Sequence, residues 1–290
     1  GVSENISIYK SISSGEGNYM LIEKVKVSDH VEIEYSLSGT ASEYTLLFVH
    51  GLGSNLNQFI PQQQYFAQNY RVLLISLRGH GNSPAPLNPT QADYTINKMA
   101  RDVQSLLTHL DIKKVHFVGN SLGGLIGYEL LELDHGLLSS LTTFGTTPML
   151  HSSSFTTRTL LTMHRFLGPK GIAWLIGISA SQDKAVRTRL KPMYEMVSKD
   201  ALEMITMNIA DYDYMDTICR HNIPMMVIRG GLDKWINKNL GPVLEIMEQK
   251  PFFELVEIPN AGHFANMENP SDFNEILGGF LIKQSIRNYL

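Results

Sequence analysis

The chain has 290 residues, of which 43% are hydrophobic and 18% are charged, and its formal net charge is −4 at pH 7. This composition is typical of a folded globular protein that is large enough for one domain with a substantial insertion. The slight negative charge argues against nucleic-acid binding and against a basic membrane-binding patch.

Hydropathy and cysteine content narrow the class of protein further. No apolar run approaches the roughly 20 residues that span a bilayer, and no signal-peptide pattern opens the chain. The single cysteine, Cys219, excludes an intramolecular disulfide, and we expect it to be a small core residue in a helical segment. These features predict a cytoplasmic protein without a transmembrane segment.

Taken in order, the chain starts with a polar leader over residues 1–18, and apolar runs then alternate with amphipathic segments. Alternating residues over 21–27 and 31–37 predict a hairpin with one solvated face. Further strands are predicted over 45–49, 71–77, 115–118, 138–144, 224–228 and 252–258. Helices are predicted over 58–68, 96–110, 125–131, 240–249 and within 270–289.

Residues 148–213 interrupt this alternation, because they contain helical patterns and no strand-like run. We expect this insertion to form a helical cap over a core made of residues 1–147 and 214–290. Methionine is frequent in and beside it, and methionine at helical spacing more often fills a core than lines a substrate cleft. The residues are Met149, Met163, Met193, Met196, Met204, Met207 and Met215.

A hairpin followed by alternating strands and helices predicts an α/β fold. Its sheet has eight mostly parallel strands, with helices on both faces. Ligands of such sheets bind beyond the carboxyl ends of the strands. The unusual motifs of this chain all follow strands, so we expect them to meet at that edge.

One motif combines a strand, a sharp turn and a helix. Gly119-Asn120-Ser121-Leu122-Gly123 fits G-x-S-x-G between the apolar strand at 115–118 and a helical pattern from Leu125. The serine backbone of such a turn is strained, so small residues are needed two positions before and after it. The backbone N–H of Leu122 then faces a developing oxyanion above the sheet.

With this motif, the chain resembles the α/β-hydrolase superfamily over residues 20–285, in its single-domain branch with a cap. Four signatures match in order, and an acidic position follows the strand after the insertion. They are His50-Gly51-Leu52-Gly53-Ser54, Arg78-Gly79-His80-Gly81-Asn82-Ser83, the elbow at 119–123, Asp233, and Ile258-Pro259-Asn260-Ala261-Gly262-His263 with Asn269-Pro270. One departure is Leu77, where the family often has an acidic residue of structural role.

The resemblance implies a catalytic triad of Ser121 as nucleophile, His263 as base and Asp233 as the acid that orients the base. It also implies an oxyanion hole made by the backbone N–H groups of Leu52 and Leu122. Neither a cofactor nor a metal is expected.

Competing residues have simpler interpretations. His50 and His80 lie in turns where a structural hydrogen-bonding role is expected, and Arg78 and Arg229 also have a structural interpretation. Three further acids lie in a stretch with a helical pattern, where a solvated face or a helix start accounts for them: Asp211, Asp213 and Asp216.

The combined features predict a hydrolase of small or medium apolar carboxylic esters that acts through an acyl-enzyme. Three alternatives stay open. Asn120 before the serine is also found in C–C bond hydrolases of ring-fission products, lactone hydrolases share the same motifs, and some members of the fold act as ligand receptors.

Overall fold

The computed structural model describes residues 20–28, 30–40, 44–151 and 181–287. The predicted leader and Met163 lie outside these residues, as does the middle of the insertion. Among the described residues, no helix is both long and apolar enough to cross a membrane.

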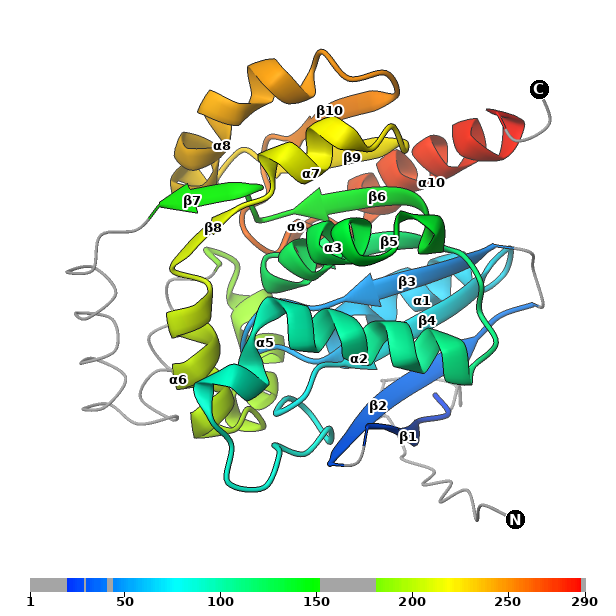
Figure 1. Ribbon diagram of the computed structural model, residues 1–290. Coiled ribbons are helices and arrows are strands. Elements are labelled where there is room, and N and C mark those ends of the chain that lie inside the picture. Colours follow the sequence, from blue (N-terminus) through cyan, green and yellow to red (C-terminus); the bar gives the residue numbers. More distant parts are fainter. Residues whose placement is uncertain (1–19, 29, 41–43, 152–180, 288–290) are drawn as a thin grey trace.

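An eight-stranded sheet forms the centre of the fold, with the strand order β1-β2-β4-β3-β5-β6-β9-β10 (Figure 1). β2 runs antiparallel to both β1 and β4, and all other neighbours are parallel. The strands are β1 (Glu23–Ser28), β2 (Val31–Ser38), β3 (Thr45–Val49), β4 (Arg71–Ser76), β5 (Val115–Asn120), β6 (Leu138–Phe144), β9 (Met225–Gly230) and β10 (Phe253–Ile258). The predicted sheet and its hairpin are therefore confirmed.

Helices cover both faces of the sheet, as predicted. Alternate residues of β3 show the two cores, because Leu47 and Val49 pack on one face while Leu46 and Phe48 pack on the other. The first core includes residues of α2, α3, α7 and α8, and the second includes residues of α1 and α10. The bounds are η1 (Leu56–Phe59), α1 (Ile60–Phe66), η2 (Gln91–Tyr94), α2 (Ile96–His109), α3 (Leu122–Leu133), η3 (His135–Leu137), α7 (Met215–Arg220), α8 (Lys234–Met247), α9 (Ala265–Glu268) and α10 (Pro270–Arg287).

The described part of the insertion contains two helices, α5 (Lys184–Glu195) and α6 (Lys199–Asn208), and two strands, β7 (Met149–His151) and β8 (Asp211–Asp213). The strands correct the expectation of an insertion without strands: they pair antiparallel, with Leu150 opposite Tyr212. Three residues are too few to produce a recognisable alternation in sequence. Figure 1 shows α5 and α6 beyond the arrowheads of β3 and β6.

Two further details differ from the sequence-based expectation. α8 begins at Lys234 rather than Leu240, because the Asp233 side chain caps it and accepts a hydrogen bond from the Ile236 amide at 3.3 Å. Cys219 is exposed on the short helix α7, so the expectation of a core position is wrong.

Candidate active site

Ser121 occupies the predicted sharp turn between β5 and α3. Its φ of 52° and ψ of −116° lie in a region that residues with a side chain rarely adopt. The backbone at Gly123 lies too close to β3 for a side chain, because a Cβ there would be 2.1 Å from the Val49 carbonyl oxygen. A Cβ on Gly119 would lie 2.5 Å from the Gly123 carbonyl carbon. The two glycines therefore give the turn its room, as the sequence predicted.

The candidate base and acid come from the loops after β10 and β9, which are neighbouring parallel strands. His263 Nδ1 lies 2.7 Å from Asp233 Oδ2, and the two side chains are 28% and 11% exposed. A carboxylate only accepts, so Nδ1 carries the proton and Nε2 is left as the basic nitrogen. The structure thus brings the predicted acid and base together in the arrangement that general-base catalysis needs.

The elbow and the loop that carries His263 also meet. The side-chain amide of Asn120, next to Ser121, donates a hydrogen bond to the His263 carbonyl oxygen at 3.0 Å. Ser121 and His263 are therefore placed at one edge of the sheet by a direct contact between their segments, although 142 positions separate them in the sequence.

The turn over residues 51–54 lies against Ser121, because a Cβ on Gly51 would be 3.2 Å from the Ser121 Cβ. The Ser54 amide donates to the Gly51 carbonyl at 3.1 Å, and Gly53 has a φ of +81°, as the third position of a type II turn requires. Leu52 occupies the second position, whose amide takes no part in the turn hydrogen bond. Leu122 is the first residue of α3, so its amide has no partner within the helix. Leu122 thus directly follows the candidate nucleophile, and Leu52 directly follows Gly51 in the turn that lies against it.

His50 and His80 are fully buried and serve the turns that contain them. His50 Nδ1 donates to the Gly51 carbonyl at 2.7 Å, and its Nε2 accepts from the Leu77 amide at 2.9 Å. His80 Nδ1 donates to the Arg78 carbonyl at 3.0 Å. Burial lowers the pKa of His80 to about 4. Burial, and next the repulsion between the two rings when both are protonated, lowers the pKa of His50 well below its usual value. Both rings are therefore neutral structural groups, as the sequence led us to expect.

Helix α5 of the insertion packs on the 51–54 turn. Ser54 Oγ donates to Met193 Sδ at 3.4 Å, and the Tyr194 ring would lie 2.3 Å from a Cβ on Gly53. Met193 and Tyr194 belong to an apolar cluster that includes Phe264, the residue after His263. Met193 therefore fills a core, as expected of most methionines here, whereas Met196 is 41% exposed.

A small polar cavity of about 100 Å³ lies beside Asp233 and His263. Glu268 lines this cavity, and the sequence analysis did not identify it. One Glu268 oxygen accepts from the Gly262 amide at 2.5 Å, and the other accepts from the Ser181 hydroxyl. The carboxylate therefore ties Ser181 of the insertion to the loop of His263. Its place five residues after His263 is the signal that could have identified it.

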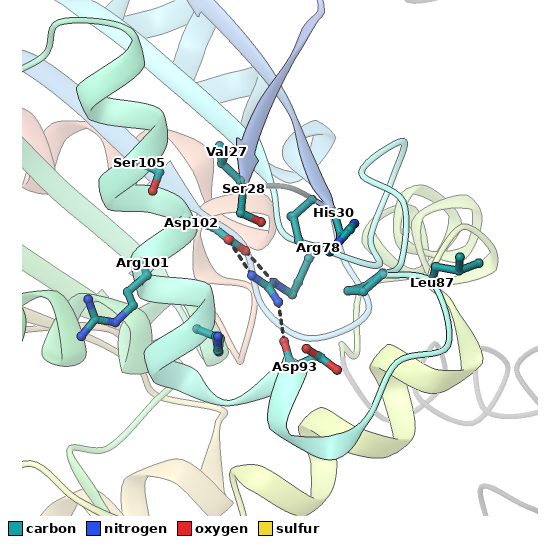
Figure 2. Close-up of a pocket in the computed structure, with 12 residues that line it drawn as sticks. Val27, Ser28, His30, Arg78, Leu87, Asp93, Arg101, Asp102 and Ser105 are labelled. Atoms are coloured by element: carbon teal, nitrogen blue, oxygen red, sulfur yellow. Dashed lines mark hydrogen bonds and ion pairs between the residues drawn. The ribbon is translucent and has the colours of Figure 1, made fainter.

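Arg78 has the structural role that the sequence indicated. Its guanidinium donates two hydrogen bonds of 2.6 Å to the Asp102 carboxylate, and a third to the Asp93 carbonyl. Figure 2 shows these contacts at the wall of a cavity of about 340 Å³ between the β1–β2 hairpin and α2. Burial raises the pKa of Asp102, and Arg78 opposes that effect. This larger cavity contains none of the candidate catalytic residues.

The other acids are not near this site. Asp211 and Asp213 lie exposed on β8, which corrects the helical pattern assigned to them, and Asp216 lies on α7. Asp211 Oδ1 instead pairs with His151 at 2.7 Å. Arg229 pairs with Glu257 across β9 and β10. Within the described ranges, no group of histidine, cysteine and acidic side chains could hold a metal ion.

Comparisons with known proteins agree with this fold. Residues 44–168 match the model of the alpha/beta hydrolase fold family. The chain is 26% identical over 254 residues to 3-oxoadipate enol-lactonase 2 of Acinetobacter baylyi, which covers 84% of this chain and 91% of the relative. It is 25% identical over 249 residues to the pimeloyl-[acyl-carrier protein] methyl ester esterase of Aeromonas salmonicida, covering 81% and 94%. A hydrolase of Pseudomonas aeruginosa PA01 superposes with a TM-score of 0.74 and 25% identity, covering 90% of this chain and 98% of that structure. The chain therefore has the α/β-hydrolase fold and is a hydrolase.

Proposed function

We propose that this protein hydrolyses small or medium carboxylic esters, with Ser121 as nucleophile, His263 as general base and Asp233 as the acid that orients it. The observation that carries the proposal is the 2.7 Å contact between His263 Nδ1 and Asp233, beside a serine held at a positive φ. A strained nucleophile next to an oriented base is the arrangement that activates a serine hydroxyl.

In this mechanism, Ser121 Oγ bonds to the ester carbonyl carbon while its proton passes to His263 Nε2. The ester C–O bond then breaks, and the alcohol leaves with that proton, which creates an acyl-enzyme. Water attacks the acyl carbon with His263 again as base, and the acid departs as the Ser121 hydroxyl is restored. Asp233 stabilises the imidazolium in both halves without taking the proton.

The amides of Leu52 and Leu122 are the proposed oxyanion hole. Each amide is fixed by backbone structure, one by the 51–54 turn and the other by the start of α3. Donors of this kind act where negative charge develops on the carbonyl oxygen, and the loss of one typically lowers kcat by about 100- to 1,000-fold. Because both donors are main-chain groups, the side chains at these positions matter little for the chemistry.

We also propose that residues 148–213 act as a cap that shapes the substrate site. Helix α5 supports this role, since Met193 and Tyr194 contact the 51–54 turn and share a cluster with Phe264. These side chains are buried, so they hold α5 against the turn and against the loop of His263.

A lactone is the second candidate substrate, because the relative from Acinetobacter baylyi is named an enol-lactonase. A lactone is a cyclic ester, so the same attack and the same acyl-enzyme apply. The two candidates differ in the leaving group, which stays attached to the acyl chain in a lactone.

The test is hydrolysis of p-nitrophenyl esters from acetate to palmitate, with γ-lactones and the variant Ser121→Ala alongside. We expect turnover that peaks at one chain length and is lost in the variant, whose circular dichroism stays native. A folded wild-type protein that turned over no ester would contradict ester hydrolysis. Near wild-type activity in Ser121→Ala would contradict the assignment of the nucleophile.

A further inference from the structure

Five buried amide side chains form one hydrogen-bonded network beneath the candidate active site. Gln58 Nε2 donates to Asn120 Oδ1 at 3.0 Å and to Asn266 Oδ1 at 3.3 Å. Asn266 Nδ2 donates to Gln62 Oε1 at 3.1 Å, and Gln62 Nε2 donates to Asn274 Oδ1 at 3.0 Å. All five side chains are buried, and none of them carries a charge at any pH. The network joins η1 and α1 to the elbow, to α9 and to α10.

Asn120 is the end of this network that reaches the candidate catalytic residues. Its Nδ2 donates to the His263 carbonyl at 3.0 Å and to the Phe144 carbonyl at 3.3 Å. Two carbonyl oxygens can only accept, so the nitrogen must face them and Oδ1 must face Gln58. The Ser121 amide donates to the same Phe144 carbonyl at 2.9 Å. The backbone of Ser121 and the side chain of Asn120 are therefore anchored at one point on β6.

The surroundings of Asn120 leave no space for a different arrangement. A Cβ on Gly145, whose φ is +61°, would lie 2.7 Å from Asn120 Nδ2 and 2.8 Å from the His263 carbonyl oxygen. A Cβ on Gly51 would lie 3.0 Å from Asn120 Oδ1. Gly51 and Gly145 therefore lie on the two sides of the Asn120 side-chain amide. A side chain at Gly145 would clash with the hydrogen bond from Asn120 to the His263 carbonyl.

We propose that Asn120 is a positioning residue that fixes the His263 segment relative to Ser121, and that Gln58 holds the Asn120 amide in the required orientation. The proposal rests on the proposed function, because it assigns Ser121 and His263 their catalytic roles. The connection is short and stiff: Asn120 is covalently joined to the nucleophile and bonded to the main chain of the base. Proton transfer from the Ser121 hydroxyl to His263 Nε2 depends steeply on the distance between them. A misplacement of about 1 Å can lower the rate by about 100-fold.

The test compares kcat and KM of wild type, Asn120→Ala and the nearly isosteric Asn120→Asp on the best p-nitrophenyl ester. In Asn120→Asp a carboxylate oxygen replaces the donor and faces two carbonyl oxygens. We expect kcat to fall by about 10- to 100-fold in both variants while KM stays within about threefold. Gln58→Leu removes the donor to Asn120 Oδ1 and to Asn266 Oδ1 but leaves the Asn120 side chain in place. It should lower kcat by less, and it keeps the proposal testable if the Asn120 variants do not fold.

Tyr128→Phe is the matched control. It removes one buried hydrogen bond of 3.0 Å, between the Tyr128 hydroxyl and the Thr143 hydroxyl on β6, and this bond does not involve the His263 segment. It should lose comparable stability with no change in kcat. If folded Asn120→Ala and Gln58→Leu both keep wild-type kcat while Ser121→Ala is inactive, the positioning role is wrong and the triad stands. If Ser121→Ala remains active, the proposed function itself has failed.

Discussion

Two loops at the carboxyl edge of the sheet each carry a histidine, and the fold places the two imidazoles in opposite environments. His80 is fully buried, donates to a backbone carbonyl, and has an Nε2 without a donor among the described residues. His263 is partly exposed and its Nδ1 faces the Asp233 carboxylate. A general base needs a group that stabilises its protonated form and a second nitrogen that is open to substrate. The partner of the ring and the access of solvent therefore distinguish the structural role of His80 from the catalytic role proposed for His263.

The largest effect that this comparison predicts is on the rate. His263→Gln should lower kcat by about a million-fold, as loss of the base does in serine-protease triads, whereas His80→Gln should leave kcat of the folded protein within about threefold. The measurement is steady-state ester hydrolysis, with the folded fraction of each variant checked by circular dichroism. Similar losses in kcat for the two folded variants would show that the environments of the two rings do not decide their roles.

The next effect concerns the ion pair that supports the His80 turn. Arg78→Met leaves the Asp102 carboxylate buried without its partner, so the free energy of unfolding should fall by about 3–5 kcal/mol. Urea unfolding measures the loss, and kcat of the folded variant should be unchanged. The double variant Arg78→Met/Asp102→Leu should recover much of the stability. A loss in the double variant as large as in the single one would mean that the buried charge is not the cause.

Acid should destabilise the protein through its buried neutral histidines. Burial lowers the pKa of His80 and of His116 to about 4, so the unfolded chain binds more protons than the folded one below the usual value of 6.5. The stabilisation is complete above that value and is lost as the pH falls towards 4. It is on the order of 3 kcal/mol for each ring. Urea unfolding between pH 7 and pH 4 measures the slope, and His116→Asn, which keeps a donor towards Ser140, should make the slope shallower. If the free energy of unfolding of the variant falls with pH as steeply as that of wild type, His116 does not contribute to the acid destabilisation.

The smallest effect is expected at Cys219. Because this thiol is exposed on α7 and away from the candidate active site, Cys219→Ser should change the free energy of unfolding by less than about 0.5 kcal/mol. Ellman's reagent should react with the thiol of the native protein within minutes, and the modified enzyme should keep its kcat. A thiol that reacts only after unfolding would contradict the exposed position.

Much of the sheet could be predicted from sequence, because buried parallel strands are continuous apolar runs. β3 and β5 are buried along their whole length, and their predicted positions agree with the structure. The short strands β7 and β8 were missed, since three residues carry no periodicity. The start of α8 was placed too late, because the cap on Asp233 lies outside the apolar pattern that defined the helix.

Part of the candidate site could also be predicted from the sequence, and part could not. Motifs predicted Ser121, Asp233 and His263 because each follows a strand, and strand ends share one edge. The amide network could not be predicted, because Gln58, Asn120 and Asn266 have no common spacing and an amide carries no charge pattern. The one sequence signal of this network is Asn120, whose place beside the serine belongs to a motif but does not by itself indicate a contact with the His263 segment.

The pairing of β7 with β8 has a consequence for how this protein can vary. The strands face each other residue for residue, so the chain leaves the core and returns to it within one inter-strand spacing, about 5 Å. A segment with such closely spaced ends can be lengthened, shortened or exchanged with little strain on β6 and β9. The ends of the segment over residues 152–210 therefore put little constraint on its length, whereas Ser181, Met193 and Tyr194 within it are constrained by their contacts with Glu268 and the 51–54 turn.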